Sequence, residues 1–182
     1  MLWMLAIAGG AMTYLFTTNT FDVAVRLRVM LPFTDFTEVT WAVLPVWLYI
    51  PFATIVVVGC ANAVNLTDGL DGLATGLSMT SAGAFAFFAY VLGRIDTTGY
   101  FVLFYLPGSG ELAVFCAALM GACLGFLWFN AHPAKVFMGD SGSLPLGGLL
   151  AWMALVAKQE LVLPLIGFVF FAELGSSWLQ TQ

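Results

Sequence analysis

Amides and carboxylates recur every three residues where a long apolar run meets two glycines. Residues 62–72 read Asn-Ala-Val-Asn-Leu-Thr-Asp-Gly-Leu-Asp-Gly. On a helix, residues three apart lie close together on one face, and Gly69 and Gly72 favour a helix end or a sharp turn. We therefore expect a polar cavity at the edge of the apolar run, lined by Asn62, Asn65, Asp68 and Asp71. Simple capping of a helix end is the structural alternative. A calcium loop is excluded because the alternate oxygen ligands and the distal Glu are missing.

A second polar group surrounds Asp140. Residues 129–143 read Phe-Asn-Ala-His-Pro-Ala-Lys-Val-Phe-Met-Gly-Asp-Ser-Gly-Ser, with a glycine on either side of the aspartate. Such a backbone can bend tightly and offer N–H groups to an anion. The residues that follow could instead cap and begin the next helix; these are Ser141, Ser143 and Pro145. Capping does not account for Asp140 together with Lys135 and His132.

The composition places these polar groups in a membrane protein. The chain has 182 residues, of which 62% are hydrophobic and 8% charged, and its mean hydropathy is +1.00. Soluble domains carry about 25% charged residues. No basic stretch of the kind that binds nucleic acid is present, so we exclude that class. The three cysteines lie in apolar runs without metal-ligand spacing.

The hydropathy pattern predicts an all-α, polytopic transmembrane helix bundle that forms a single domain over residues 1–182. About six stretches are long and apolar enough, or nearly so, to cross a bilayer: 1–17, 44–66, 73–93, 111–130, 143–157 and 161–180. Residues 18–43 read as an extramembrane excursion, a short hairpin, because charged residues interrupt the run at Asp22, Arg26, Arg28, Asp35 and Glu38. Residues 94–110 read as a second loop.

The number of crossings brings the two polar groups together. Between residues 72 and 131 the chain crosses the membrane twice, so both groups lie on the same face. Three carboxylates gathered at one face suit Mg²⁺, which binds one or two carboxylates together with substrate phosphates. Phosphoryl transfer needs mainly this positioning and charge stabilisation. A channel or transporter with polar helices is the alternative from a different class. The roles of His132 and Glu173 stay open.

These motifs resemble the polyprenyl-phosphate N-acetylhexosamine-1-phosphate transferase superfamily. The resemblance rests on residues 62–74, on Phe126-Leu-Trp-Phe-Asn and on residues 133–144, and it extends over the whole chain. Thr67 and Trp128-Phe129 favour the branch that uses UDP-N-acetylmuramoyl-pentapeptide. The resemblance implies transfer of phospho-N-acetylmuramoyl-pentapeptide to undecaprenyl phosphate with release of UMP. A relative that uses UDP-GlcNAc is the alternative.

The resemblance also implies roles for individual residues. Asp140 matches the Mg²⁺-binding aspartate, and Asp68 and Asp71 match carboxylates of the catalytic pocket. Substrate-binding positions are matched by Asn65, Asn130, Phe137 and Lys135, and Phe137 corresponds to an aromatic residue that stacks on uracil. By analogy with the family we expect a multi-pass protein of the bacterial inner (plasma) membrane, in contact with membrane lipid, with cytoplasmic active-site loops and a homodimeric state.

Two features of the superfamily are missing from this sequence. An upstream Asp-Asp pair and a downstream histidine-rich motif do not occur in it, so we expect a fragment that lacks both termini and is inactive alone, or a truncated remnant. Basic residues also favour the opposite orientation, because Lys135 alone lies on the face of the polar groups while Arg26, Arg28, Arg94 and Lys158 lie on the other. We follow the resemblance, since missing loops would add charges.

Overall fold

The computed structural model describes residues 2–18, 26–30, 43–101 and 103–180, and regular structure in these ranges is helical. The prediction of an all-α helix bundle is therefore confirmed. The helices are α1 (Leu2–Thr17), α3 (Val46–Thr67), α4 (Leu73–Leu92), α5 (Ile95–Phe101), α6 (Ser109–Asn130), α7 (Asp140–Val156), α8 (Leu163–Ile166) and α9 (Phe168–Gln180).

Three of the described helices, α3, α4 and α6, are long and apolar enough to cross a membrane. The helix α1 and the Phe168–Ser177 part of α9 are apolar but shorter. Long apolar runs form helices in a bilayer because every backbone N–H and C=O then has a partner within the same segment. The chain is thus a membrane helix bundle, in which shorter helices pack against the long ones.

Three of the predicted boundaries are wrong. The stretch 161–180 is not one helix, because a short α8 with Pro164 in its first turn ends at Ile166, and α9 begins after Gly167. Helix α7 begins at Asp140 and not at 143. The predicted loop 94–110 contains helix α5, whose Thr98 hydroxyl bonds the carbonyl groups of Arg94 and Ile95.

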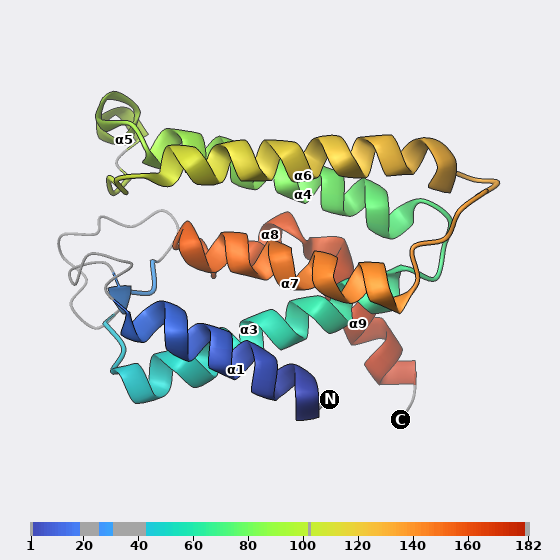
Figure 1. The fold of residues 1–182 in the computed structure, drawn as a ribbon, viewed down its shortest axis with the longest axis horizontal. Helices are drawn as coiled ribbons and strands as arrows, with labels where there is room; N and C mark the ends of the chain where they lie inside the picture. The colour runs from blue at the N-terminus through green and yellow to red at the C-terminus, as the bar shows by residue number, and fades with distance from the viewer. Residues whose placement is uncertain (1, 19–25, 31–42, 102, 181–182) are drawn as a thin grey trace.

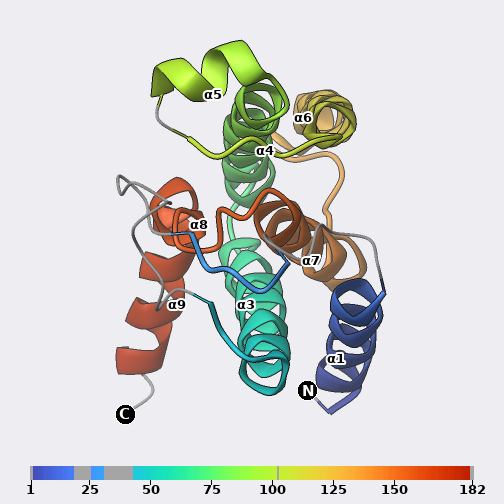
Figure 2. The same ribbon diagram turned by 90° about the vertical axis from the view of Figure 1, so that its left-hand side faces the viewer.

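The helices form two groups that pack side by side (Figures 1 and 2). Helices α4 and α6 run antiparallel as one pair, and α3 and α7 pack against each other as the second. Helices α1 and α9 lie on opposite sides of α3. The core between the pairs is apolar and includes Val64, Phe85, Leu150 and Met153, each of them buried.

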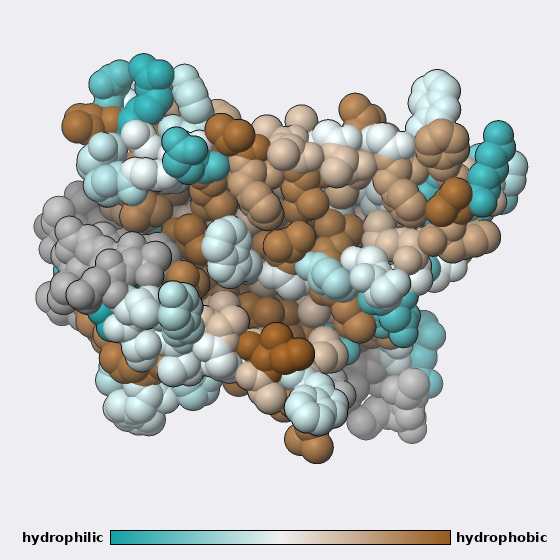
Figure 3. All heavy atoms as spheres, in the orientation of Figure 1, coloured by the Kyte–Doolittle hydropathy of each residue, from teal (hydrophilic) through white to brown (hydrophobic). Residues whose placement is uncertain are grey.

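Hydrophobic side chains dominate the middle of the face shown in Figure 3, and hydrophilic ones gather towards the ends of the bundle. Trp128, for example, is 84% exposed although it lies on a helix of spanning length. A surface of this kind suits a lipid environment, because apolar side chains can contact the hydrocarbon of lipid tails without a cost in free energy.

Both polar groups of the sequence lie at one end of the bundle, on the right in Figure 1, where α3 and α6 end and α4 and α7 begin. The prediction from the number of crossings is confirmed. The turn between α3 and α4 depends on Gly72, whose φ is +74° and whose missing Cβ would lie 3.4 Å from the Asn130 carbonyl oxygen. A side chain there would be strained and would press against the end of α6.

The opposite end holds a buried charged cluster. The Lys158 amine donates to the Arg26 carbonyl at 2.7 Å and to the Tyr49 hydroxyl at 2.9 Å, and the same hydroxyl donates to Glu160 at 2.5 Å. Burial lowers the pKa of the Lys158 amine to about 8 and raises the pKa of the Glu160 carboxyl. This cluster fastens the α7–α8 connection to the start of α3 and to the segment after α1.

The predicted excursion over 18–43 is described only in part. An antiparallel bridge joins Arg28 to Val43, and the Leu44 N–H donates to the Leu27 carbonyl at 3.0 Å. This pairing agrees with a hairpin at the two ends of the segment. The expected charges at Asp22, Asp35 and Glu38 lie outside the described residues.

Candidate active site

Asn65 links the two polar groups. Its side-chain amide, in the last turns of α3, donates to Asp140 Oδ1 and to Ser143 Oγ, each at 2.9 Å. Both acceptors lie on the first turn of α7, 75 and 78 residues away in the chain. Asn65 therefore holds the Asp140 carboxylate in place and leaves its second oxygen exposed for another partner.

Asp68 lies close to the same carboxylate. Helix α3 ends at Thr67, and Asp68 is the residue that follows, in the turn towards α4. Burial raises the pKa of the Asp68 carboxyl, the Gly139 N–H that it accepts lowers it, and the negative charge of Asp140 raises it again. Two carboxylates that repel each other at the mouth of a bundle form a natural site for a cation.

Asp71 is directed to the loop between α6 and α7. Its Oδ2 accepts the Ala134 N–H at 3.1 Å and lies 3.1 Å from His132 Nδ1. The Ala134 N–H is the largest cause of a lowered pKa for the Asp71 carboxyl, and His132 acts in the same direction. Asp71 thus orders the loop that leads to Asp140, and it gives His132 a partner that the sequence did not reveal.

Asn130 braces the other side of that loop. It is 3% exposed, accepts from the Thr75 hydroxyl at 2.7 Å and donates to the Val136 carbonyl at 3.0 Å. These bonds tie the end of α6 to α4 and to the chain just before Phe137. Both polar atoms of its side chain are engaged within the protein, so Asn130 shapes the site by holding its walls.

Lys135 and Phe137 point outwards from the loop. Both residues are exposed, Phe137 by 72%. In the described part of the chain the Lys135 amine has no hydrogen bond or ion pair, so it is available to a ligand. Phe137 lines a hollow of about 310 Å³ between α6 and α7, together with Ala122, Cys123, Phe126, Met138, Gly142 and Leu146.

The structure differs from the sequence-based interpretation at Asn62 and at the start of α7. Asn62 does not join the cluster, because its amide donates to the Val58 carbonyl of its own helix at 2.7 Å. No side chain caps α7, since Gly139 occupies the capping position and the serines lie inside the helix. Pro145 also lies inside α7. Ser143, which the sequence offers as a helix cap, instead accepts from Asn65, because its spacing of three residues from Asp140 places both on one face.

The donors present fit a Mg²⁺ ion held partly by substrate. Among the described residues, no group of three His, Cys, Asp or Glu side chains is arranged to hold a metal ion. Mg²⁺ does not require one, because it keeps several waters and binds through one or two carboxylates plus phosphate oxygens. Asp140, with Asp68 beside it, offers that donor set.

Comparison with known proteins shows which family the chain resembles over most of its length. Residues 2–158 match the model of glycosyl transferase family 4. The chain belongs to glycosyl transferase family 4. The match ends at Lys158, so it includes every residue of the candidate site.

Several similar proteins share one name. Phospho-N-acetylmuramoyl-pentapeptide-transferase from Gemmatimonas aurantiaca is 58% identical over 142 residues, which are 78% of this chain and 37% of the relative. Proteins of the same name are 50% identical over 169 residues in Desulfovibrio desulfuricans and 46% identical over 173 in a Geobacter species. These alignments cover 93% and 95% of this chain, and 45% and 46% of the relatives. The chain therefore spans less than half the length of these relatives.

Proposed function

We propose that this chain is the nucleotide- and Mg²⁺-binding core of an enzyme that transfers phospho-N-acetylmuramoyl-pentapeptide from UDP-MurNAc-pentapeptide to undecaprenyl phosphate. The observation that carries the proposal is the meeting of Asn65 and Asp140 beside Asp68 at one end of a membrane bundle. The name of the relatives, which are 46–58% identical, supports the choice of donor and reaction.

In this reaction a phosphate oxygen of the lipid attacks the sugar-bearing phosphorus of the nucleotide. The bond from that phosphorus to the bridging oxygen breaks, and UMP leaves. Mg²⁺ bound at Asp140 and Asp68 would neutralise the diphosphate charge. Asn65 orients Asp140, and Lys135, exposed on the loop, is placed to meet a phosphate. Phe137 offers an exposed ring on which the uracil can stack.

The loop residues act by positioning. Asp71 holds the loop through the Ala134 N–H, and Asn130 holds it through the Val136 carbonyl. Together these bonds fix both ends of the segment that carries Lys135. Positioning of this kind accounts for much of the rate of phosphoryl transfer, because the enzyme supplies little covalent chemistry.

We propose that the site end of the bundle faces the cytoplasm of a bacterium, where UDP-linked sugars are made, and that the protein lies in the plasma membrane. The single-domain organisation over 1–182 and the homodimer remain predictions. The Asp-Asp pair and the histidine motif expected from the superfamily do not occur in these 182 residues. We therefore propose that the chain alone does not catalyse the transfer.

A segment exchange tests this function. The 169 residues that match the Desulfovibrio desulfuricans relative would replace their counterpart in that protein. We expect the chimaera, in membranes with undecaprenyl phosphate and Mg²⁺, to release UMP from UDP-MurNAc-pentapeptide and not from UDP-GlcNAc. Release from UDP-GlcNAc alone would favour the related GlcNAc-1-phosphate transferase. Release from neither donor, in a chimaera that inserts normally, would favour an inactive remnant.

A further inference from the structure

Helix α5 presents large apolar and aromatic side chains to the outside of the bundle. Ile95, Tyr100 and Phe101 are all exposed, Tyr100 by 82%. The helix lies at the end of the bundle away from the candidate site, and in Figure 2, where α6 is seen end-on, α5 is seen from the side. It therefore crosses the direction of the long helices. Large apolar side chains gathered at one place on a surface mark a contact with a partner or a membrane.

The connection that carries α5 is closed tightly onto the ends of α4 and α6. At Gly93 a Cβ would lie 2.9 Å from the Gly110 backbone nitrogen, so the end of α4 touches the start of α6. The Leu106 N–H donates to the Leu92 carbonyl at 2.8 Å, and Thr98, on the inner side of α5, is buried. The place of α5 relative to the two long helices is therefore fixed.

The length of α6 sets the level of α5 in a bilayer. Ser109 begins α6, and the exposed Trp128 lies close to its other end, beside the candidate site. At 1.5 Å per residue these two residues are about 29 Å apart along the helix, and the hydrocarbon core of a bilayer is about 30 Å thick. Tryptophan is enriched at membrane–water boundaries. With Trp128 at one boundary, the start of α6, and α5 with it, lies at the other.

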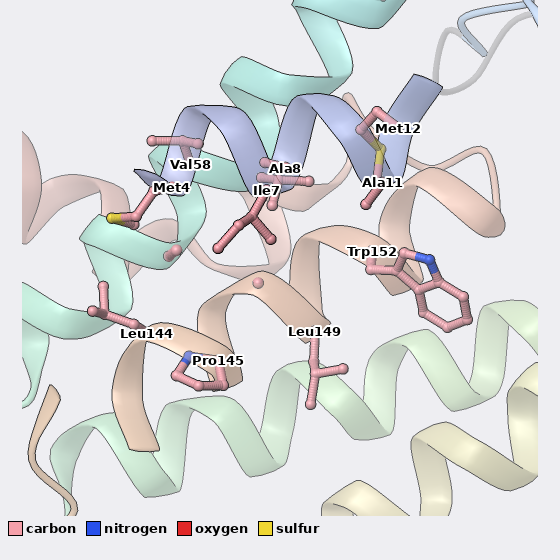
Figure 4. Close-up of a pocket in the computed structure, with 13 residues that line it drawn as sticks. Met4, Ile7, Ala8, Ala11, Met12, Val58, Leu144, Pro145, Leu149 and Trp152 are labelled. Carbon is pink, nitrogen blue, oxygen red and sulfur yellow. The ribbon is translucent and has the colours of Figure 1, made fainter. Parts of the chain in front are cut away.

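The surface of the bundle between these two levels is apolar. Val114 and Leu124 are exposed on α6. Away from α6, a groove between α1, α3 and α7 is lined by apolar residues alone, and its α7 wall runs from Leu144 to Trp152 (Figure 4). Surfaces of this kind belong at the level of the lipid tails. The first charged side chains after α4 therefore mark the point where that level ends.

Those charged side chains fit the headgroup layer. Arg94 pairs with Asp96 at 3.2 Å, and its guanidinium lies over the Tyr90 ring, 5.5 Å from the centroid. Both members of the ion pair are exposed. Charges are costly among lipid tails, whereas tyrosine, with an apolar ring and a polar hydroxyl, is favoured at the membrane interface. Rings and charges together suit the headgroup layer better than hydrocarbon or open water.

We infer that α5 is an interfacial helix that rests in the headgroup layer of the leaflet opposite the candidate site. Its partner is the lipid surface itself. Ile95, Tyr100 and Phe101 reach the boundary between headgroups and acyl chains, and Arg94 and Asp96 stay among the headgroups. Because α5 is fixed to α4 and α6, this contact holds the depth of both helices in the bilayer. The placement is independent of the proposed transfer reaction.

Depth-resolved fluorescence quenching of the full chain in lipid nanodiscs tests this placement. The fluorophore NBD is attached to Tyr100→Cys, and because the three native cysteines are buried, labelling of the unchanged chain gives the background. The quenchers are lipids with a nitroxide on the headgroup, lipids with a nitroxide near the end of an acyl chain, and iodide in the water. We expect the headgroup nitroxide to cause the largest loss of fluorescence at position 100.

Ala118→Cys is the matched control, because Ala118 is exposed on α6 about midway between Ser109 and Trp128. At position 118 we expect the acyl-chain nitroxide to quench most strongly, the reverse of the order at position 100. Strongest quenching at position 100 by iodide would place α5 in water, and by the acyl-chain nitroxide in hydrocarbon. Quenching by none of the three would mean that another protein surface, such as a second copy of this chain, covers it. Each of these results would overturn the inference.

Ile95→Cys repeats the measurement at the start of α5, where the side chain is also exposed. Substitutions at such exposed positions usually change stability little. If Tyr100→Cys does not fold, the headgroup order at position 95 sustains the placement and any other order overturns it. Release of UMP does not enter these measurements, so the placement of α5 and the proposed function can fail separately.

Discussion

The Asn65 amide donates to Asp140 Oδ1 at 2.9 Å and thereby joins the end of α3 to the start of α7. The same amide donates to Ser143 Oγ, so two bonds fix one orientation of the side chain. With Gly139 donating its N–H to Asp68, the two polar motifs of the sequence form one continuous network. The site is therefore preorganised by groups that are far apart in the chain.

Replacing Asn65 should weaken the metal site without unfolding the protein. Asn65→Ala removes a hydrogen bond to a charged acceptor, an interaction of about 1.5–3 kcal/mol, so we expect the Mg²⁺ concentration for half-maximal UMP release in the chimaera to rise about tenfold or more. The matched control is Asn62→Ala, one turn earlier, where the amide bonds only its own helix. Equal effects of the two changes would argue against a specific role for Asn65.

The adjacent glycines of α7 should respond in opposite ways to alanine. Gly147→Ala places a methyl group 2.7 Å from Ala61 Cα and the Cys60 carbonyl oxygen, and overpacking of this kind costs about 1–3 kcal/mol. Gly148→Ala meets open space. We expect thermal unfolding in detergent, followed by intrinsic fluorescence, to show a lower Tm for the first variant only. A similar Tm for both would mean that α3 and α7 pack less closely than described.

The buried cluster at the far end should be sensitive to the loss of one charge. Lys158→Met leaves the Glu160 carboxyl buried without its cation, and breaking a buried pair in this way costs about 3–5 kcal/mol. The double variant Lys158→Met/Glu160→Leu removes both charges and should recover part of the stability. Thermal unfolding of the two variants provides the measurement.

Lys135→Met supplies the control for that comparison. Lys135 is exposed on the loop before α7, so its loss should change stability little. If Lys158→Met were no more harmful than Lys135→Met, the cluster of Lys158, Tyr49 and Glu160 would contribute little to the fold.

The loop before α7 should lose order in acid. The folded-state pKa of Asp71 is lowered, chiefly by the Ala134 N–H. The stability that this bond adds is therefore present above the ordinary Asp value of 3.8 and is lost as pH falls through the lower, folded-state value. Protection of the Ala134 amide against hydrogen exchange should decline over that range. In Asp71→Asn the protection should not depend on pH there, and persistence of the wild-type dependence in this variant would assign it to another group.

The sequence predicts much of this fold because apolar runs and polar interruptions are local signals. Runs of about 20 apolar residues locate α3, α4 and α6, and the number of crossings places residues 62–72 and 131–142 at the same end of the bundle. The break at Gly167 lies within a continuous apolar run, so hydropathy does not reveal it. The start of α7 at Asp140 is set by the backbone at Gly139 and not by a side-chain cap.

Long-range partners of polar residues are less accessible to sequence reasoning. The three-residue spacing of Asn65 and Asp68 indicates a shared site, but the same spacing also includes Asn62, whose amide turns back to its own helix. Ser143 and His132 gain their partners only when α7 and the 131–139 loop fold against α3 and the turn after it. The pairing of Tyr49 with Glu160 spans 111 residues and has no local signature.

The central claim is that Asp140 serves Mg²⁺-dependent transfer of a phospho-sugar to a lipid phosphate. Its most direct test is UMP release by the chimaera carrying Asp140→Asn, assayed with UDP-MurNAc-pentapeptide, undecaprenyl phosphate and Mg²⁺. Loss of the metal's charge stabilisation, worth several kcal/mol, predicts a fall of about a hundredfold or more, with normal insertion into the membrane. Near-normal UMP release by this variant would contradict the account.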